Sequence, residues 1–349
     1  MQSTSAVSPL SADHSVCHSL VADRYLLLEQ MEASSLYRCV DRHTLEEFVC
    51  KVVPSSQLHD HLKGYLLLDG NPRFNSIVNV LVAPEKSYIL FAPSFGDLHS
   101  YVRNVKRLRE PEAARLFHQI ASIVADCHRN GIVLRDLKLR KFVFKDAERT
   151  LLKLETLDDA IVLEDSEDDR LSDKHGCPAY VSPEILYSSK GQYSGKTADC
   201  WSLGVILFTM LVGRYPFHDS DPSLLFCKIR RGSFHIPNSL SPLAKCLIRS
   251  LLRKEPSERL TAEELLDCKW FKLMSSPNSG YCKYHNSLNS SENPDANRPP
   301  FVLLNSCQTP FLIEDKIPAD QTVPDLAVSE DTTSSLFCNG MSSVVMSQS

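Results

Sequence analysis

A nearly all-apolar run from Ala198 to Val212 is the feature that most limits how this chain can fold. The run is too long for an ordinary strand of roughly 5–6 residues, and it falls short of the ~18 residues that a bilayer-spanning helix needs. It therefore predicts a helix buried on all sides, which needs a large surrounding lobe. The 349 residues allow one two-lobed domain with tails, or two domains of average size.

Composition divides the chain into three parts. Residues 1–23 are polar and residues 272–349 are rich in Ser, Asn and Pro, so we expect both tails to be disordered. The intervening residues 24–271 show dense apolar periodicity, first of strand type and then of helix type. The sequence thus predicts an α+β fold with a β-rich N-terminal lobe and an α-helical C-terminal lobe. The expected strands include 25–28, 48–53 and 88–91, and a long amphipathic helix is expected at 112–127.

Charge and cysteine spacing exclude several classes of protein. The net charge of −5 gives no electrostatic footprint for nucleic acid. The N-terminus has no basic patch followed by an apolar core, and no apolar run has bilayer length, so neither a secretion signal nor a membrane partner is expected. The 12 cysteines include no CxxC pair, which favours reduced thiols in cytosol or nucleus over a disulfide scaffold or a zinc module.

Four segments of the C-terminal half resemble protein kinases. They look like the catalytic loop, the end of the activation segment, the helix beneath that segment and a late arginine, in family order and spacing. The resemblance implies a bilobal kinase fold in which Glu184 and Arg259 form a structural ion pair and Asp199 helps to hold the lobe together. Losing one partner of a buried ion pair costs about 3–5 kcal/mol, so we assign all three residues to architecture. The segments are 134–138, 176–184, 199–204 and 256–259.

The phosphate-binding part of the kinase pattern is degenerate. Counting back from Lys51, the three positions of the Gly-rich loop carry Glu29, Met31 and Ser34, and residues 24–63 contain no glycine. Lys51 stands where kinases place the phosphate-pairing lysine. Residues 52–84 contain no glutamate to pair with it, although Asp60 or Asp69 could substitute. Lys51 is therefore interpreted either as a residual nucleotide contact or as a strand lysine that is solvated or meets another acid.

Both metal-binding positions of the kinase pattern are also replaced. Thr156 aligns with the aspartate of Asp-Phe-Gly, and Lys141 aligns with the catalytic-loop asparagine. An ammonium ~4 Å from a divalent ion is repelled by roughly 8 kcal/mol at an effective dielectric near 20, so magnesium binding is not expected. Lys141 could instead swing away or contact a phosphate itself. Asp136 and Lys138 occupy the catalytic-base region, and we interpret Asp136 as a structural anchor, because a base without metal has little to act on.

Several segments go beyond the generic kinase pattern and resemble the Tribbles pseudokinases. The family carries Ser-Leu-Glu where kinases carry Asp-Phe-Gly, and residues 156–158 are the conservative variant Thr-Leu-Asp. The resemblance covers about residues 25–271, and residues 219–226 lean towards the third vertebrate paralogue. It implies a catalytically impaired domain that is not an enzyme and requires no cofactor, with ATP contact at most weak, magnesium-independent and through Lys51. The segments that carry the resemblance are 133–142, 171–184 and 213–218.

The tail contains a further match to this family. Residues 320–325 are similar to its Asp-Gln-x-Val-Pro-Asp/Glu motif, which recruits a photomorphogenesis-type E3 ubiquitin ligase through a WD40 propeller. The Val-Pro pair can fill an apolar pocket in an extended backbone, and the acids can meet basic residues. As a flexible coil, the 48 residues from 272 to 319 would span about 35–42 Å. The motif residues are Asp320, Gln321, Val323, Pro324 and Asp325.

A last segment that resembles the Tribbles family lies at the end of the domain. Residues 265–271 are similar to the Ile-Leu-Leu-His-Pro-Trp-Phe-like segment with which the family binds mitogen-activated kinase kinases. Cys268 and Lys269 replace His-Pro, and a packed turn at the end of the last kinase helix is an equal alternative. The matching residues are Leu265, Leu266, Trp270 and Phe271.

The leading hypothesis is an adaptor. The activation-segment region 158–180 would hold a substrate, such as a CCAAT/enhancer-binding transcription factor, while the tail recruits the ligase. The acidic run 164–169 in that region is interpreted as a solvated loop, with a substrate contact as the alternative. Two hypotheses stay open beside the adaptor: a decoy that binds Akt or mitogen-activated kinase kinases without degrading them, and an enzyme that uses ATP weakly through Lys51 and Asp136. No nuclear-import run is evident, so we expect both nucleus and cytoplasm.

Overall fold

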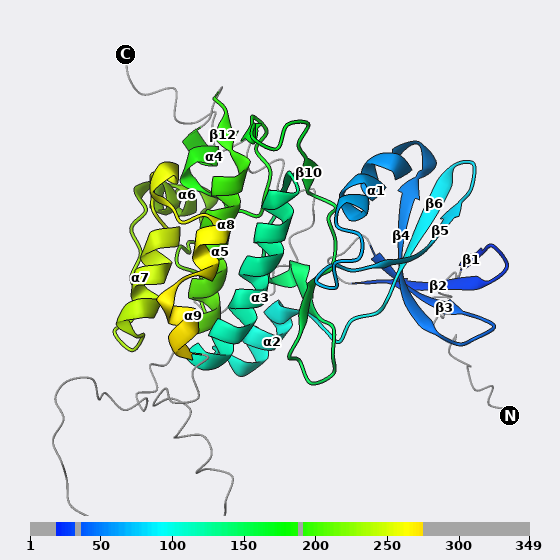
Figure 1. Ribbon diagram of the computed structural model, residues 1–349, viewed down its shortest axis with the longest axis horizontal. Coiled ribbons are helices and arrows are strands. Elements are labelled where there is room, and N and C mark those ends of the chain that lie inside the picture. The colour runs from blue at the N-terminus through cyan, green and yellow to red at the C-terminus, as the bar shows by residue number, and fades with distance from the viewer. Residues whose placement is uncertain (1–18, 32–35, 188–190, 275–349) are drawn as a thin grey trace, which may run out of the picture. The chain divides into compact units, whose positions relative to one another are not determined.

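The computed structural model describes residues 19–31, 36–187 and 191–274, so the ligase motif of the tail lies outside the described residues. The chain divides into two compact units, residues 1–58 with 77–93 and residues 59–76 with 94–349 (Figure 1). Two expected boundaries shift. A strand at Ser19–Val21 pairs with its neighbour inside the segment expected to be disordered, and the last helix continues to Met274.

The N-terminal unit is a six-stranded antiparallel sheet in the order β1-β2-β3-β4-β6-β5. The three strands expected from the sequence lie within β2, β4 and β6, so they are confirmed. Alternate residues, among them Tyr25, Leu27 and Cys50, point into one buried cluster because successive strand side chains face opposite sides. The strands are β1 Ser19–Val21, β2 Tyr25–Gln30, β3 Leu36–Asp41, β4 Glu47–Pro54, β5 Ile77–Val82 and β6 Lys86–Phe91, and a 3-10 turn follows β4 at Ser55–Gln57.

The C-terminal unit is mostly helical, which confirms the predicted order of a β-rich part followed by an α-helical part. Its helices are α1 Leu58–Leu67, α2 Leu98–Val105, α3 Glu110–Arg129, α4 Pro183–Tyr187, α5 Gly195–Val212, α6 Pro222–Arg231, α7 Pro242–Leu251, α8 Ala262–Leu266 and α9 Lys269–Met274. Short antiparallel pairs join β7 Ile132–Val133 to β10 Ile161–Val162, β8 Phe142–Phe144 to β9 Leu152–Leu154, and β11 Arg170–Leu171 to β12 Tyr193–Ser194. Two 3-10 turns lie at Leu139–Lys141 and Pro256–Glu258.

Helix α5 is the buried helix that the apolar run predicts. The Ser194 hydroxyl accepts a hydrogen bond from the Thr197 N–H at its start, and Gly213 ends it with φ 78°, a conformation that glycine adopts without steric cost. Among the described residues, α5 is long and apolar enough to cross a membrane, but 89% of it is buried inside the domain. The expectation that no apolar segment approaches 18 residues is therefore wrong in length, and burial identifies α5 as a core helix.

Helix α3 packs against α5, α8 and α9 and organises the end of the domain. Its first residue, Glu110, is buried and accepts hydrogen bonds from the backbone N–H and hydroxyl of Ser241, both at 2.7 Å, and from Trp270 Nε1 at 3.0 Å. One carboxylate therefore ties the start of α3 to the N-cap of α7 and to α9. The buried stripe of α3 is the predicted one: Ala113, Leu116, Phe117, Ile120, Ile123 and Val124.

Candidate functional site

A buried aspartate shapes the loop that resembles a kinase catalytic loop. Asp199 of α5 accepts hydrogen bonds from the backbone N–H groups of Leu134 at 2.8 Å and Arg135 at 2.9 Å, and His128 Nε2 lies 2.9 Å from it. These bonds hold Arg135 at φ 59°, where a side chain other than glycine costs about 1–3 kcal/mol. Asp199 therefore has the architectural role that the sequence predicts.

Both carboxylate oxygens of Asp136 are engaged within the protein. Oδ2 lies 2.5 Å from Lys138 Nζ, and Oδ1 accepts the backbone N–H of Cys177 at 3.0 Å. Burial alone would lower the pKa of Lys138, but the adjacent carboxylate outweighs burial and raises this pKa above its usual value. Asp136 thus connects its loop to the end of the activation segment, as expected of an anchor.

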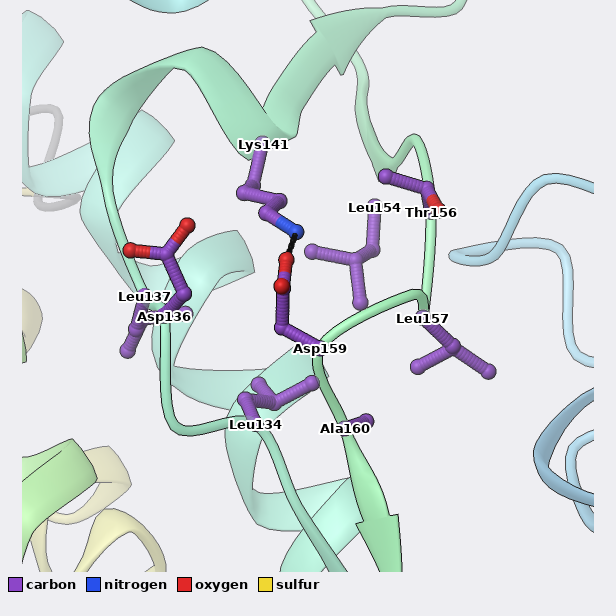
Figure 2. A pocket seen from close by; sticks show the side chains of 9 residues that line it. All are labelled: Leu134, Asp136, Leu137, Lys141, Leu154, Thr156, Leu157, Asp159 and Ala160. Carbon is purple, nitrogen blue, oxygen red and sulfur yellow. Dashed lines mark hydrogen bonds and ion pairs between the residues drawn. The ribbon is translucent and has the colours of Figure 1, made fainter. Parts of the chain in front are cut away.

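Lys141 makes an internal ion pair at the position where kinases hold a metal ion. Its Nζ contacts Asp159 Oδ2 (Figure 2). His175 Nε2 lies 3.0 Å from Oδ1 of the same carboxylate. Arg135 Nε donates to the Asp159 carbonyl at 2.6 Å. Burial would raise the pKa of the Asp159 carboxyl, but His175 and Lys141 outweigh it and hold this pKa well below its usual range. A carboxylate of the chain therefore neutralises the ammonium group that replaces a metal ligand.

Thr156 stands at the other metal position, where its side chain hydrogen-bonds to the backbone. Its hydroxyl accepts the Asp158 N–H at 3.1 Å, which closes a tight turn, and the Tyr65 hydroxyl accepts the Leu157 N–H at 3.2 Å. Burial raises the pKa of Tyr65, so its hydroxyl stays protonated. Gly64 lies so near that an added Cβ would be 3.1 Å from the Leu157 side chain. Helix α1 therefore packs directly on this turn.

A small pocket lies beside these contacts, within the C-terminal unit. Its cavity volume is about 10 Å³, room for roughly one water molecule, whereas sites for drug-sized ligands have about 300–1,000 Å³. Figure 2 shows Lys141 and Asp159 pointing toward one another across it, with leucine side chains around them. Among the residues that the structure describes, no group of three or more His, Cys, Asp or Glu side chains is placed to hold a metal ion. The lining residues are Leu134, Asp136, Leu137, Lys141, Leu154, Thr156, Leu157, Asp159 and Ala160.

Glu155, directly before this turn, carries a strongly perturbed carboxyl. Burial and the nearby Asp97 raise the pKa of Glu155 to about 7, against weaker opposing effects of Lys141 and Lys153. Below the usual glutamate pKa near 4.5, the carboxyl is protonated in both folded and unfolded chains. As pH rises from there to about 7, the unfolded chain releases this proton while the folded chain retains it. Glu155 therefore lowers the free energy of unfolding progressively as pH rises through this range, and by a constant amount above it.

We expect Glu155→Gln to stabilise the domain at alkaline pH. Since one pKa unit corresponds to about 1.4 kcal/mol, the variant should gain about 3 kcal/mol in unfolding free energy at pH ~8.5 over wild type, and less than about 1 kcal/mol at pH ~5. Urea unfolding at both pH values measures the difference. The exposed Glu148 provides the control, because Glu148→Gln should change neither value by more than about 0.5 kcal/mol. An equal gain of the Glu155 variant at both pH values would contradict a titrating carboxyl.

The structure contains the ion pair expected between Glu184 and Arg259. The two guanidinium nitrogens lie 2.6 and 2.7 Å from the two carboxylate oxygens, and the Arg259 side chain is fully buried. Arg259 also donates to the backbone carbonyls of Thr197, Arg253 and Lys254. This bidentate pair therefore joins α4 to the start of α5 and to the loop that follows α7.

The predicted phosphate-contacting residues lie in the N-terminal unit. Lys51 is buried on β4, where it stands opposite Leu36 and Ile89. Glu29, at the first position of the missing Gly-rich loop, is held by Arg38 at 2.7 Å. Met31 is half-buried, and Ser34 lies outside the described residues. Poor phosphate binding at Glu29 stays a prediction, since Arg38 already neutralises its carboxylate.

The segment expected to bind mitogen-activated kinase kinases faces largely inward. Leu265, Trp270 and Phe271 are buried, and Leu266 is half-buried. Phe271 stacks with Phe117 of α3 at 6.1 Å between ring centroids. These residues therefore form the packed turn that was the alternative reading, and docking by a partner stays a prediction.

The acidic run 164–169 of the activation segment is solvated as predicted over residues 164–168, which are exposed, and only Asp169 is half-buried. Asp169 accepts the Ser194 hydroxyl at 2.5 Å and the Lys196 N–H at 3.0 Å, while Asp168 pairs with Arg170 at 2.6 Å. Arg135 pairs with Asp173 at 2.5 Å. Asp169 thus ties the end of the run to β12 and α5, and Asp173 ties the following residues to the catalytic-like loop, while a substrate contact of the run stays a prediction.

Sequence reasoning missed Asp159 and Tyr65. The signal for Asp159 was the doubled aspartate at 158–159, since a buried lysine in place of a metal ligand needs a carboxylate. No local pattern distinguishes Tyr65 from an ordinary core residue of α1.

Comparison with known proteins identifies two levels of relationship. The protein kinase domain family matches residues 30–271, which confirms the bilobal kinase-like fold predicted from the four segments. Among curated relatives, Tribbles homolog 2 of Canis lupus familiaris is 58% identical over 274 residues, which cover 78% of this chain and 79% of that protein.

Two further relatives are similar at the same level. Tribbles homolog 1 of Homo sapiens is 58% identical over 259 residues, 74% of this chain and 69% of that protein. Tribbles homolog 3 of Mus musculus is 55% identical over 248 residues, 71% of this chain and 70% of that protein. The predicted resemblance to the Tribbles family is confirmed, whereas the lean towards the third paralogue is not resolved by these near-equal identities.

Proposed function

This chain belongs to the Tribbles pseudokinase family, and from that premise we propose that it is an adaptor, which holds a protein substrate on its kinase-like domain and recruits an E3 ubiquitin ligase through its tail. The observation that carries the non-catalytic part of this proposal is the contact of Lys141 with Asp159, backed by His175. An internal cation there repels a divalent ion and leaves no charge on Asp159 for one to balance.

The catalytic-base position supports the same conclusion. Asp136 already accepts hydrogen bonds from Lys138 and Cys177, so a substrate hydroxyl would have to displace one of them. Phosphoryl transfer depends mainly on positioning and on charge stabilisation by metal ions. A domain in which these residues make internal contacts therefore keeps the kinase fold without kinase activity. In this proposal, nucleotide contact through Lys51 is weak and magnesium-independent.

The activation segment is the surface that we propose for the substrate. Its contacts through Asp159, Asp169 and Asp173 fix the segment before any partner arrives. A preordered surface binds with a smaller entropic cost than one that must fold on binding. A CCAAT/enhancer-binding transcription factor is the substrate that the family resemblance suggests. With such a substrate, we propose that the protein is present in both nucleus and cytoplasm.

The tail motif 320–325 supplies the ligase in this proposal. Its Val-Pro pair fits an apolar pocket on a WD40 propeller, and tethering ligase and substrate to one chain raises their effective concentration without any new contact. Modulation of Akt and of mitogen-activated kinase kinases would follow from the same binding surfaces. The burial of Trp270 and Phe271 favours the adaptor over a decoy that docks through residues 265–271.

Affinity purification of two deletion variants tests the adaptor. Removing residues 320–325 should abolish recovery of the ligase and leave recovery of the substrate unchanged, because the motif is separate from the domain. Removing residues 330–335, of equal length, should leave both. If the first deletion retains the ligase at the wild-type level, the adaptor is contradicted and the decoy becomes the better account.

A further inference from the structure

Three elements of the C-terminal unit bring an exposed tyrosine among basic side chains, away from the pocket of Figure 2. Tyr187 ends α4 and is 52% exposed, and its hydroxyl donates to the Arg230 carbonyl of α6 at 3.1 Å. Helices α4 and α6 lie side by side at the same end of the unit (Figure 1). The Lys254 Nζ lies 5.7 Å from the centre of the Tyr187 ring. We call Tyr187, Leu224, Arg230, Arg231 and Lys254 together the Tyr187 surface.

The Glu184–Arg259 ion pair holds this surface rigid from below. Glu184 lies one helical turn before Tyr187 on α4, while Arg259 donates to the Lys254 carbonyl at 3.2 Å. The same ion pair therefore fixes the ring and the lysine that lies over it. Because the backbone that carries both groups is fixed, a partner would not have to order it on binding.

Within the part of the chain that the structure describes, Arg231 and Lys254 of this surface have no acidic partner. Lys228 of α6 pairs with Asp219 at 2.9 Å, but Arg231 and Lys254 are exposed and neither forms an ion pair with any residue that the structure describes. Arg230 is half-buried and meets Cys227 Sγ at 3.4 Å rather than a carboxylate. Basic residues at the end of a helix are favoured by its dipole, which accounts for Arg230 and Arg231. The dipole of α6 does not account for Lys254 on another element.

Apolar surface accompanies these charges. Tyr187 and Leu224, which is 53% exposed, lie on the two packed helices that carry the surface. Tyrosine and arginine are the residue types enriched at the centres of protein interfaces, where an aromatic ring supplies area at little entropic cost. An exposed aromatic ring beside cations that pair with none of the described acidic residues is suited to bind an acidic peptide that also carries apolar side chains.

We infer that the Tyr187 surface docks an acidic segment of a partner protein. Carboxylates of that segment pair with Arg231 and Lys254, and an apolar side chain packs on Tyr187 and Leu224. The residues of this site lie outside 158–180 and 320–325 in the sequence, so the proposal requires neither ligase recruitment nor substrate binding there.

The test uses the full chain and a fluorescein-labelled peptide of three Glu-Glu-Leu-Asp repeats as the probe. Fluorescence anisotropy should show binding that weakens as salt is raised from about 50 to about 300 mM, because exposed charges are screened. Arg231→Glu with Lys254→Glu should weaken binding by at least about tenfold. The control pair, Lys106→Glu with Arg107→Glu on the exposed loop after α2, should stay within about twofold of wild type.

Two further variants separate the ring from the charges. Tyr187→Phe keeps the apolar ring and should bind the peptide like wild type, whereas Tyr187→Ala should bind it at least about fivefold more weakly. A carbodiimide, which joins a carboxylate to an amine as an amide with loss of water to the reagent, should couple the peptide to Lys254 in mass spectra. Absence of binding at about 1 mM peptide, or equal loss in the control pair, would overturn the proposal.

Discussion

Arg259→Ala should lower the free energy of unfolding by about 3–5 kcal/mol, because it leaves the mostly buried Glu184 carboxylate without its counter-charge. The change also removes the donor to three backbone carbonyls, at Thr197, Arg253 and Lys254. A domain of this kind has a total stability of about 5–15 kcal/mol, so the variant should unfold at markedly lower urea concentration. Equilibrium unfolding followed by circular dichroism measures the loss.

Arg253→Ala is the matched control for this prediction. Arg253 is exposed, and its guanidinium lies 3.8 Å from Glu258, so the loss should be within about 1 kcal/mol. Glu184→Gln should resemble the Arg259 variant, since it leaves the buried guanidinium unpaired. A loss below about 1 kcal/mol for Arg259→Ala would show that the lobe does not depend on this ion pair.

Val323→Ala with Pro324→Ala should weaken ligase binding more than tenfold while the stability of the domain stays at the wild-type value. Short linear motifs concentrate their binding energy in a few anchors, and losing two anchors costs more than about 2 kcal/mol. Calorimetric titration of the ligase propeller into the full-length chain and into the isolated peptide 310–349 measures this cost.

The control for the tail exchanges two apolar residues outside the motif. Val344→Ala with Val345→Ala should leave the affinity for the propeller unchanged. Equal affinity of the motif variant and wild type would remove the tail from ligase recruitment. An affinity that is higher for the isolated peptide than for the full chain would show that the domain competes for the tail.

The fold was predictable because its signals are local or are spread over many residues. The apolar composition of residues 198–212 alone predicts a buried helix. The β-branched residues and the alternation of apolar and polar residues near positions 25, 48 and 88 predict the strands. The pair of Glu184 and Arg259 was predictable through the kinase resemblance, although the two residues lie 75 positions apart.

The contacts of the candidate site were less predictable, because they depend on where long side chains reach. The degenerate metal positions at Thr156 and Lys141 follow from matching the chain to the kinase pattern. The partner of Lys141 could not be predicted in this way, because Asp158 and Asp159 are adjacent and only the conformation of the turn decides which of them faces Lys141. The same limit applies to Trp270, whose sequence match to a docking segment gives no sign that Glu110 holds it inside.

Calorimetric titration of ATP into the purified full-length chain, with and without magnesium, tests the central claim most directly. The claim is that Lys141 and Thr156 leave the kinase-like site without metal-dependent phosphate binding. We expect the same weak affinity, or the same absence of heat, with magnesium and with a chelator present, because the ammonium of Lys141 already pairs with Asp159. A tightening of ATP binding by tenfold or more on adding magnesium, about 1.4 kcal/mol, would contradict the claim.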